Sequence, residues 1–194
     1  VVHLNRYVPG AHGEVSIASK AEKLYVALPA PPLSSIDHAA LEMVHHTLLE
    51  GESGRLQRLL VNELELASYA FGFLPSLSYD SIYEMGFDLR ESVAPEMLLE
   101  KLRDALQTLL TSGISERELE RARNRIELDV VQGLQTVEQR AHTLGFWEVV
   151  VGDCRLTESR LSEYASLDTT DVNAAINRWW SIDKLSWTIG RCEV

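Results

Sequence analysis

Residues 48–56 run Leu48-Leu49-Glu50-Gly51-Glu52-Ser53-Gly54-Arg55-Leu56, and they place a corner with two glycines between two helical patterns. The upstream pattern has its apolar residues on one helix face, at Leu41, Val44, Leu48 and Leu49. Gly51 is suited to end that helix, because glycine adopts left-handed backbone conformations without strain. Ser53 can cap a second helix, which continues to about Glu63. Two helices joined by so short a corner are an unusual arrangement, so this stretch helps to distinguish one fold class from another.

From Leu66 to Arg90 the apolar period changes to two, which predicts a β-hairpin. Large side chains alternate in both runs, at Tyr69, Phe71 and Phe73, and then at Tyr83, Met85, Phe87 and Leu89. We expect cross-strand aromatic pairs, which stabilise a hairpin by roughly 0.2–1 kcal/mol each. Gly72 and Gly86 interrupt the strands and indicate bulges or close approach by another backbone.

Two half-buried strands are predicted before the corner, at Val15–Ile17 and Leu24–Leu28, joined at Lys20-Ala21-Glu22. Prolines then end the second strand, because proline cannot donate a hydrogen bond to a sheet. Ser34 or Ser35 is expected to cap the helix that leads into the corner.

Helices dominate the chain after the hairpin. Pro95 suits the first position of a helix that Gly113 ends. A capping box, Ser115-Glu116-Arg117-Glu118, opens a helical pattern that runs to about Val151, with a break at Gly133 followed by a second box, Thr136-Val137-Glu138-Gln139. Shorter helices follow from about Glu158 and Asp171, and a final strand spans Leu185–Cys192.

The predicted element order is β-β-α-α-β-β-α-α-α-α-β, with the broken helical pattern counted once. Strand pairs separated by helices indicate an α+β fold, here a two-layer sandwich with a largely antiparallel sheet and helices on one face. A chain of 194 residues without repeats or linkers fits a single domain, 1–194. Because the chain opens at Val1 without a start methionine, we expect a segment of a longer protein.

The formal charge of −11 argues against a nucleic-acid surface, which needs clustered basic residues. It is compatible with a preference for basic or extended cationic peptides. The apolar runs are too short to predict a membrane span. Cys154 and Cys192 could pair, although two buried thiols are the commoner arrangement.

The one constellation resembling a metal site is His38, Glu42, His45 and His46, which share a helix face. We favour an exposed polar face in which Glu42 pairs with a histidine three or four residues away. The zinc-peptidase motifs His-x-x-Glu-His and His-Glu-x-x-His are both absent from the sequence. No catalytic and no metal-binding residue is therefore predicted.

Two further features have a structural and a functional interpretation. Glu52, Ser53 and Arg55 could bind an anion at a helix N-terminus, but a structural cap is the commoner role of such residues. Trp179-Trp180 could stack a ligand, but we expect the pair to cover the edge of the core. Nucleophile elbows, P-loops and dinucleotide fingerprints are absent from the sequence.

The Leu41–Arg90 block resembles the carboxy-terminal, non-catalytic half of pitrilysin/insulinase-type zinc peptidases, including the processing-peptidase-like branch. Residues 51–56 stand in place of that family's Gly-Gly-x-Ser-Ser-Arg-Leu corner, and Leu60-Val61-Asn62-Glu63 and Leu66-Ala67-Ser68 follow it. The element order agrees on both sides, so the similarity spans nearly the whole chain.

This resemblance implies a half-domain that closes on a homologous catalytic half and encloses a peptide. In such proteins zinc is bound by the other half, so no cofactor is expected in this segment. The family's non-catalytic half often supplies an Arg and a Tyr that contact substrate. Asn62 and Ser68 stand at those positions here, and Tyr69 is displaced by one residue, which would turn it to the opposite strand face.

We therefore predict a peptide-enclosing, non-catalytic peptidase half that works with a zinc-bearing half on the same polypeptide or on a paired subunit. A purely structural subunit, like the core proteins of respiratory complexes, is the first alternative. A stand-alone ligand-binding module with its own closed apolar pocket is the second. The family resemblance suggests a bacterial protein of the periplasm or the cytoplasm, with the periplasm preferred.

Overall fold

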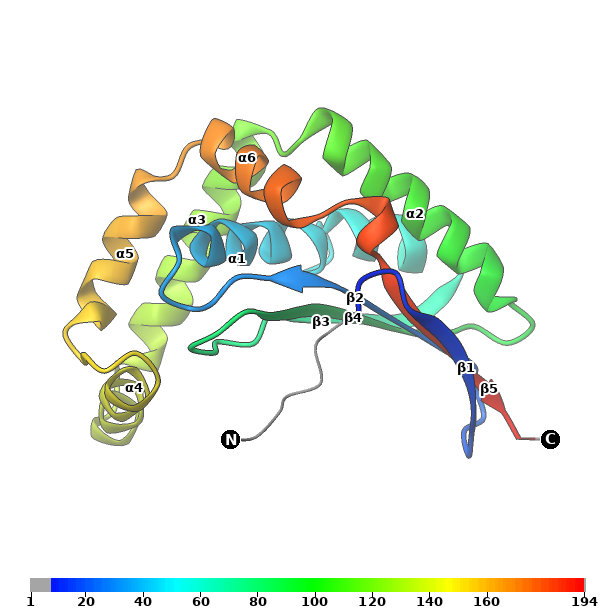
Figure 1. Ribbon diagram of the computed structural model, residues 1–194, viewed down its shortest axis with the longest axis horizontal. Helices are drawn as coiled ribbons and strands as arrows, with labels where there is room; N and C mark the ends of the chain where they lie inside the picture. Colours follow the sequence, from blue (N-terminus) through cyan, green and yellow to red (C-terminus); the bar gives the residue numbers. More distant parts are fainter. Residues whose placement is uncertain (1–7, 194) are drawn as a thin grey trace.

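A computed structural model describes residues 8–193 of the chain. It shows two layers, a twisted sheet and a set of helices, most of which cover one face of that sheet (Figure 1). The strands are β1 (His12–Ile17), β2 (Lys23–Ala30), β3 (Ala67–Phe73), β4 (Ser81–Leu89) and β5 (Ser186–Cys192). Among residues 8–193, no second layer covers the sheet face opposite the helices, and we call this face the open face.

The helical layer comprises α1 (Ile36–Leu48), a π-helix η1 (Gln57–Glu63), α2 (Pro95–Ser112), α3 (Glu116–Gly133), α4 (Val137–Val150), α5 (Leu156–Ser166), α6 (Thr169–Trp179) and a 3₁₀ turn η2 (Ile182–Lys184). The predicted α+β sandwich is thus confirmed. The order written from the sequence had one helix too few after the hairpin. The second capping box, at Thr136 and Gln139, starts α4 as a separate helix after α3 ends at Gly133.

The strands are arranged β1-β5-β2-β4-β3, and every neighbouring pair is antiparallel except β1 with β5. Although β1 and β2 are joined by a short link, β5 lies between them. The expectation that β1 is half-buried was wrong, since nearly all of its residues are exposed. Ile189 of β5 and Leu24 of β2 are fully buried, so these two strands occupy the middle of the sheet and leave β1 at its edge.

The hydrophobic core lies between the sheet and α1, which buries eight of its residues. The largest core side chains from β4 are Tyr83, Met85, Phe87 and Leu89.

Helix boundaries follow the predicted local signals. Ser35 caps α1, Pro95 begins α2, Gly113 ends α2 with a φ of 68°, and Ser115 forms its capping box with Glu118. The serine and glycine signals satisfy backbone groups that a helix end leaves without intrahelical partners, and Pro95 has no N–H that would need a partner.

The corner between α1 and η1 requires both glycines, for different reasons. Gly51 has a φ of 66°, in the left-handed region that glycine adopts at low cost. Gly54 lies so close to the end of α1 that a Cβ there would be 2.8 Å from the Leu48 carbonyl oxygen. The predicted cap at Ser53 was wrong, because the helical backbone begins at Arg55, just ahead of η1, and the Gly54 carbonyl accepts from the Arg58 amide at 2.8 Å.

The hairpin is present, but its large side chains do not form the predicted cross-strand pairs. Phe71 lies opposite Gly86, and its ring occupies the space that a Cβ at Gly86 would need. The aromatic residues of β3 therefore point to the open face, while those of β4 point into the core. Neither glycine forms a bulge, since the register shift lies between Ala67 and Tyr69. The close approach at these glycines comes from side chains and not from another backbone.

Candidate functional site

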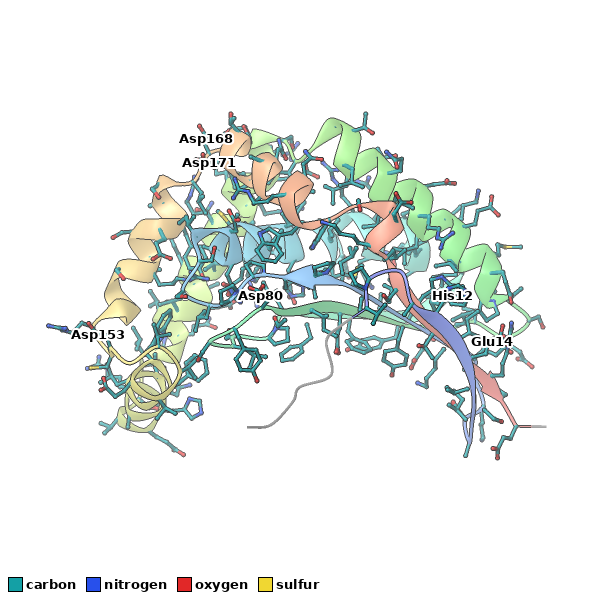
Figure 2. The ribbon with its side chains drawn as sticks, viewed as in Figure 1. His12, Glu14, Asp80, Asp153, Asp168 and Asp171 are labelled. Atoms are coloured by element: carbon teal, nitrogen blue, oxygen red, sulfur yellow. The ribbon has the colours of Figure 1, made fainter. Side chains whose placement is uncertain are left out.

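Side chains project from the open face on the side away from the helices (Figure 2). Strand alternation sends Tyr25 of β2 and Phe71 of β3 to this face. Large apolar side chains remain exposed here without a covering element, with Tyr69 56% and Phe73 57% exposed. A sheet face of this kind indicates a surface that contacts another molecule.

The predicted substrate-facing residues Asn62, Ser68 and Tyr69 are all exposed. Asn62 lies on η1, whereas Ser68 and Tyr69 lie at the start of β3. The bulge after Ala67 sends Tyr69 outward, and the Ser68 hydroxyl donates to the Asp88 carbonyl at 3.2 Å. No hydrogen bond links Asn62 to the other two in the described part of the chain, and their contact with substrate stays a prediction.

Three aromatic rings form a connected group on the open face, which we call the aromatic row. The Phe71 ring lies edge-on to Tyr25 with 6.0 Å between ring centroids, and it stacks on Tyr69 at 6.0 Å. Gly86 makes this possible, because a side chain there would collide with the Phe71 ring. The row offers a rigid apolar surface to an extended chain.

Beside the aromatic row, the open face is hollowed into a trough of about 580 Å³ over β1, β5 and β2. Its lining combines small side chains with a few large ones, among them Gly13, Val15, Tyr25, Ala27, Glu84, Ser186 and Thr188. This trough is not predictable from the sequence. Alternation shows which residues share a strand face, but the strand order that brings β1, β5 and β2 together is not visible in the sequence.

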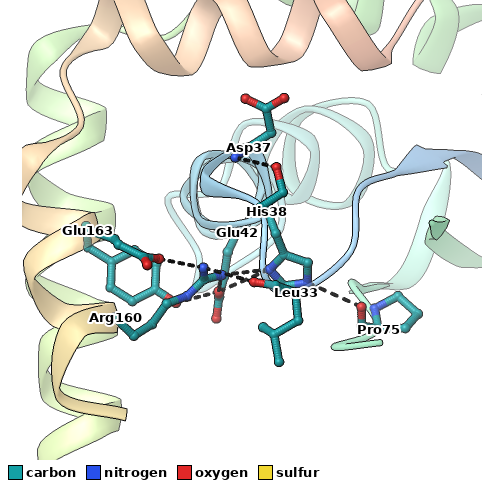
Figure 3. Close-up of polar contacts among 9 residues, drawn as sticks. Leu33, Asp37, His38, Glu42, Pro75, Arg160 and Glu163 are labelled. Carbon is teal, nitrogen blue, oxygen red and sulfur yellow. Dashed lines mark hydrogen bonds and ion pairs between the residues drawn. The ribbon is translucent and has the colours of Figure 1, made fainter. Parts of the chain in front are cut away.

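The predicted exposed polar face of α1 was wrong for its first member. His38 is only 1% exposed, and it lies between α1, α5 and the loop after β3 (Figure 3). Its Nδ1 accepts from the Arg160 guanidinium at 2.8 Å, and its Nε2 donates to the Pro75 carbonyl at 3.3 Å. Burial lowers the pKa of His38, although Glu42 opposes the shift, and the neutral ring suits an acceptor for Arg160.

Arg160 is itself 6% exposed and joins the elements around His38. It donates to the Leu33 carbonyl at 3.3 Å, to the Glu163 carboxylate at 2.8 Å and to the Tyr164 hydroxyl at 3.1 Å. The Tyr164 hydroxyl in turn donates to Glu42 at 2.5 Å. The predicted pairing of Glu42 with a histidine is present as a 3.8 Å contact to His38. We call this group the Arg160 network.

His45 and His46 are half-buried and make separate contacts. The Tyr83 hydroxyl lies 3.0 Å from His45 Nδ1, and the Glu50 carboxylate lies 3.4 Å from His45 Nε2. Burial lowers the pKa of both histidines. Among the side chains that the structure describes, those of residues 8–155 and 159–193, no cluster of three or more His, Cys, Asp or Glu could hold a metal ion.

Arg55 of the corner holds the helical layer together. Its guanidinium donates to both Glu118 carboxylate oxygens, at 2.5 and 2.6 Å, and to the Gly113 carbonyl at 3.0 Å. Burial alone would raise the pKa of Glu118, but hydrogen bonds from Arg55 and Ser115 lower it to about 2. Nε and Nη2 of Arg55 therefore donate to protein acceptors, which supports a structural role for the corner.

The remaining sequence candidates are structural as well. Trp180 is buried, stacks on Tyr83 with 5.2 Å between centroids and donates to the Pro29 carbonyl at 3.1 Å. Trp179 donates to Asp37 at 2.9 Å. The pair covers the core, as predicted. Cys154 and Cys192 are half-buried and form no disulfide in the described structure. In the same residues, no helix is long and apolar enough to cross a membrane.

Solved structures share this architecture. A Helicobacter pylori protease is 20% identical with a TM-score of 0.86, over 94% of this chain and 44% of that one. The inactive peptidase domain of a candidate zinc protease from Bordetella parapertussis is 24% identical with a TM-score of 0.80, over 90% and 92%. The Escherichia coli periplasmic protease PqqL is 16% identical with a TM-score of 0.77, over 98% and 21%. Relatives this distant show the fold alone.

The chain thus spans less than half of the H. pylori protease and about a fifth of PqqL. No curated protein matches its sequence. The family model described as the peptidase M16 inactive domain matches residues 9–126, more than half of the chain. This match confirms the resemblance identified from the Leu41–Arg90 block. The chain belongs to the peptidase M16 family, as one of its inactive domains.

Proposed function

We propose that this inactive domain encloses peptides against a homologous, zinc-bearing half. The observation that carries the proposal is the open face, where no helix or strand of residues 8–193 covers the aromatic row and the trough, while the helices pack on the other side. A second half placed against this face would turn it into one wall of a chamber. An extended peptide matches such a wall, because it presents alternate side chains to a sheet surface.

The zinc ion would belong to the partner half. The donors of α1 do not fit a zinc site, since Arg160 and Pro75 occupy the two ring nitrogens of His38 and Tyr83 contacts His45. Zinc needs about four ligands that converge on one point. This half would therefore bind and orient the peptide, and the partner half would supply the metal that activates water.

The partner half lies on the same polypeptide or on a separate subunit, which makes the working unit a pseudo-dimer or a dimer. The length of the H. pylori relative, more than twice the matched segment, supports the first arrangement. We place the protein in a bacterial periplasm, by analogy with the periplasmic PqqL.

Three measurements test this proposal. The purified chain should contain far less than one equivalent of zinc and should not cleave peptides. It should bind fluorescently labelled extended peptides, detected by anisotropy. Mixed with its zinc-bearing half, it should restore peptide cleavage that neither half shows alone. Stoichiometric zinc in the isolated chain would contradict the proposal, whereas a stable complex that neither binds nor cleaves peptides would indicate a purely structural subunit.

A further inference from the structure

On the open face, small residues line the floor of the trough, whereas larger side chains stand beside it. Ala27 of β2 lies between Glu84 of β4 and Ser186 of β5 in the sheet register, and Tyr25 lies beside Thr188. All five side chains share the open face, because directly paired residues in a sheet point the same way. The small side chains leave a hollow, and the longer side chains of Tyr25 and Glu84 border it on the β4 side.

One carboxylate of the trough has no counter-charge among the described residues. Of its two acidic residues, Glu14 forms an ion pair with Arg191 at 3.0 Å. Glu84 has no basic group within 4.0 Å among residues 8–193. Elsewhere on the open face, Lys23 and Asp88 neutralise each other at 2.6 Å. The half-buried Glu84 is therefore a fixed negative charge at the border of an apolar hollow.

A lysine or arginine side chain fits this combination. Its aliphatic stem can lie along apolar surface while its charged end reaches a polar group. Glu84 would accept hydrogen bonds from that end, and the Tyr25 ring offers its negative face to the same cation. The Glu84 carboxylate would repel an acidic side chain of the peptide. A purely apolar side chain would cover part of Glu84 without offering it a hydrogen-bond partner, which costs free energy.

We propose that the trough is a subsite for a lysine or arginine side chain of the enclosed peptide, and that Glu84 determines this specificity. The inference rests on the proposed function, because it requires a peptide on the open face. It narrows the substrate class to peptides with a basic residue at one position. The formal charge of −11 favours the approach of such peptides but cannot select a position, whereas a single carboxylate in a trough can.

The test uses labelled extended peptides that differ only at one central residue, which is lysine, arginine, norleucine or glutamate. Norleucine keeps the apolar stem of lysine without its charge. We expect the lysine and arginine peptides to bind the wild-type chain about 5- to 10-fold more tightly than the norleucine peptide, as for a partly desolvated cation beside a carboxylate and a ring. Glu84→Gln should reduce this ratio to about one, and Glu84→Lys should favour the glutamate peptide.

Glu120→Gln is the matched control, because it removes the same charge from an exposed position on α3. It should leave the ratio unchanged. A lysine preference that persists in Glu84→Gln would overturn this inference. A preference that Glu120→Gln abolishes as fully as Glu84→Gln does would also overturn it, because the effect would then come from the overall charge of the chain. Equal binding of all peptides would overturn it too, while leaving the peptide-enclosing function in place. Absence of binding by any peptide would instead contradict the proposed function itself.

Discussion

Arg160 shows how a single buried side chain can hold several elements in place. Its guanidinium contacts α1 through His38, the preceding loop through Leu33, and its own helix through Glu163 and Tyr164. Each partner would lose a hydrogen bond if the guanidinium were removed, and buried polar groups without partners are costly. The network therefore fixes the position of α5 against α1.

We predict that Arg160→Met lowers the free energy of unfolding by about 2–4 kcal/mol, because it leaves His38 Nδ1 and the Leu33 carbonyl without a donor. The measurement is urea denaturation followed by circular dichroism. Arg103→Met on α2 is the control, since Arg103 is exposed. Equal stability of the two variants would contradict a structural role for the network.

Acidification should destabilise the fold through His38 and His45. Burial lowers the pKa of both below the ordinary 6.5, so at mildly acidic pH the unfolded chain binds more protons than the folded one. The contribution of these two histidines to the free energy of unfolding is therefore fully present above about pH 6.5. It decreases as the pH drops toward their lowered pKa values. Denaturation midpoints across this range should decrease less steeply in His38→Gln than in wild type. His142→Gln, on the exposed surface of α4, should leave the slope unchanged.

Local signals in the sequence predicted most of the elements, for a physical reason. Caps at Ser35, Ser115 and Thr136 act through hydrogen bonds within a few residues, so the sequence records them directly. The faces of the hairpin could not be derived in this way. Alternation assigned a shared face within each strand, but the pairing of Phe71 with Gly86 depends on register and on the bulge before Tyr69.

The close packing at Gly54, in the corner between α1 and η1, gives a prediction that compares this glycine with Gly133 on α3. Gly54→Ala would place a Cβ 2.8 Å from the Leu48 carbonyl oxygen, a backbone atom that cannot move away alone. We expect this variant to lose about 1–3 kcal/mol of unfolding free energy, as overpacked substitutions do. Gly133→Ala at the end of α3 meets no atom within 4 Å and should be neutral or stabilising by up to about 1 kcal/mol. Urea denaturation of both variants checks the contrast.

At the scale of the whole molecule, the candidate site was only partly predictable. Asn62, Ser68 and Tyr69 came from a family resemblance; they lie on the surface, and their contact with substrate stays a prediction. Arg160 and Glu84 were missed because the residues that surround them in the fold are distant in sequence. Arg160 contacts His38 across 122 positions, and Glu84 borders a trough that β5, the last strand, helps to form. Nothing in the sequence around either residue marks such contacts.

The division between a covered and an open sheet face yields the last prediction. Phe73 on the open face and Val131 on α3 are 57% and 58% exposed, so replacing either with serine should change the unfolding free energy little. Their effects on peptide binding should differ, because only Phe73 lies on the face that we assign to the peptide. Phe73→Ser should weaken binding about 3- to 10-fold in anisotropy titrations, the usual range for one aromatic contact. Val131→Ser should bind as wild type does, and equal losses in both variants would place the peptide elsewhere.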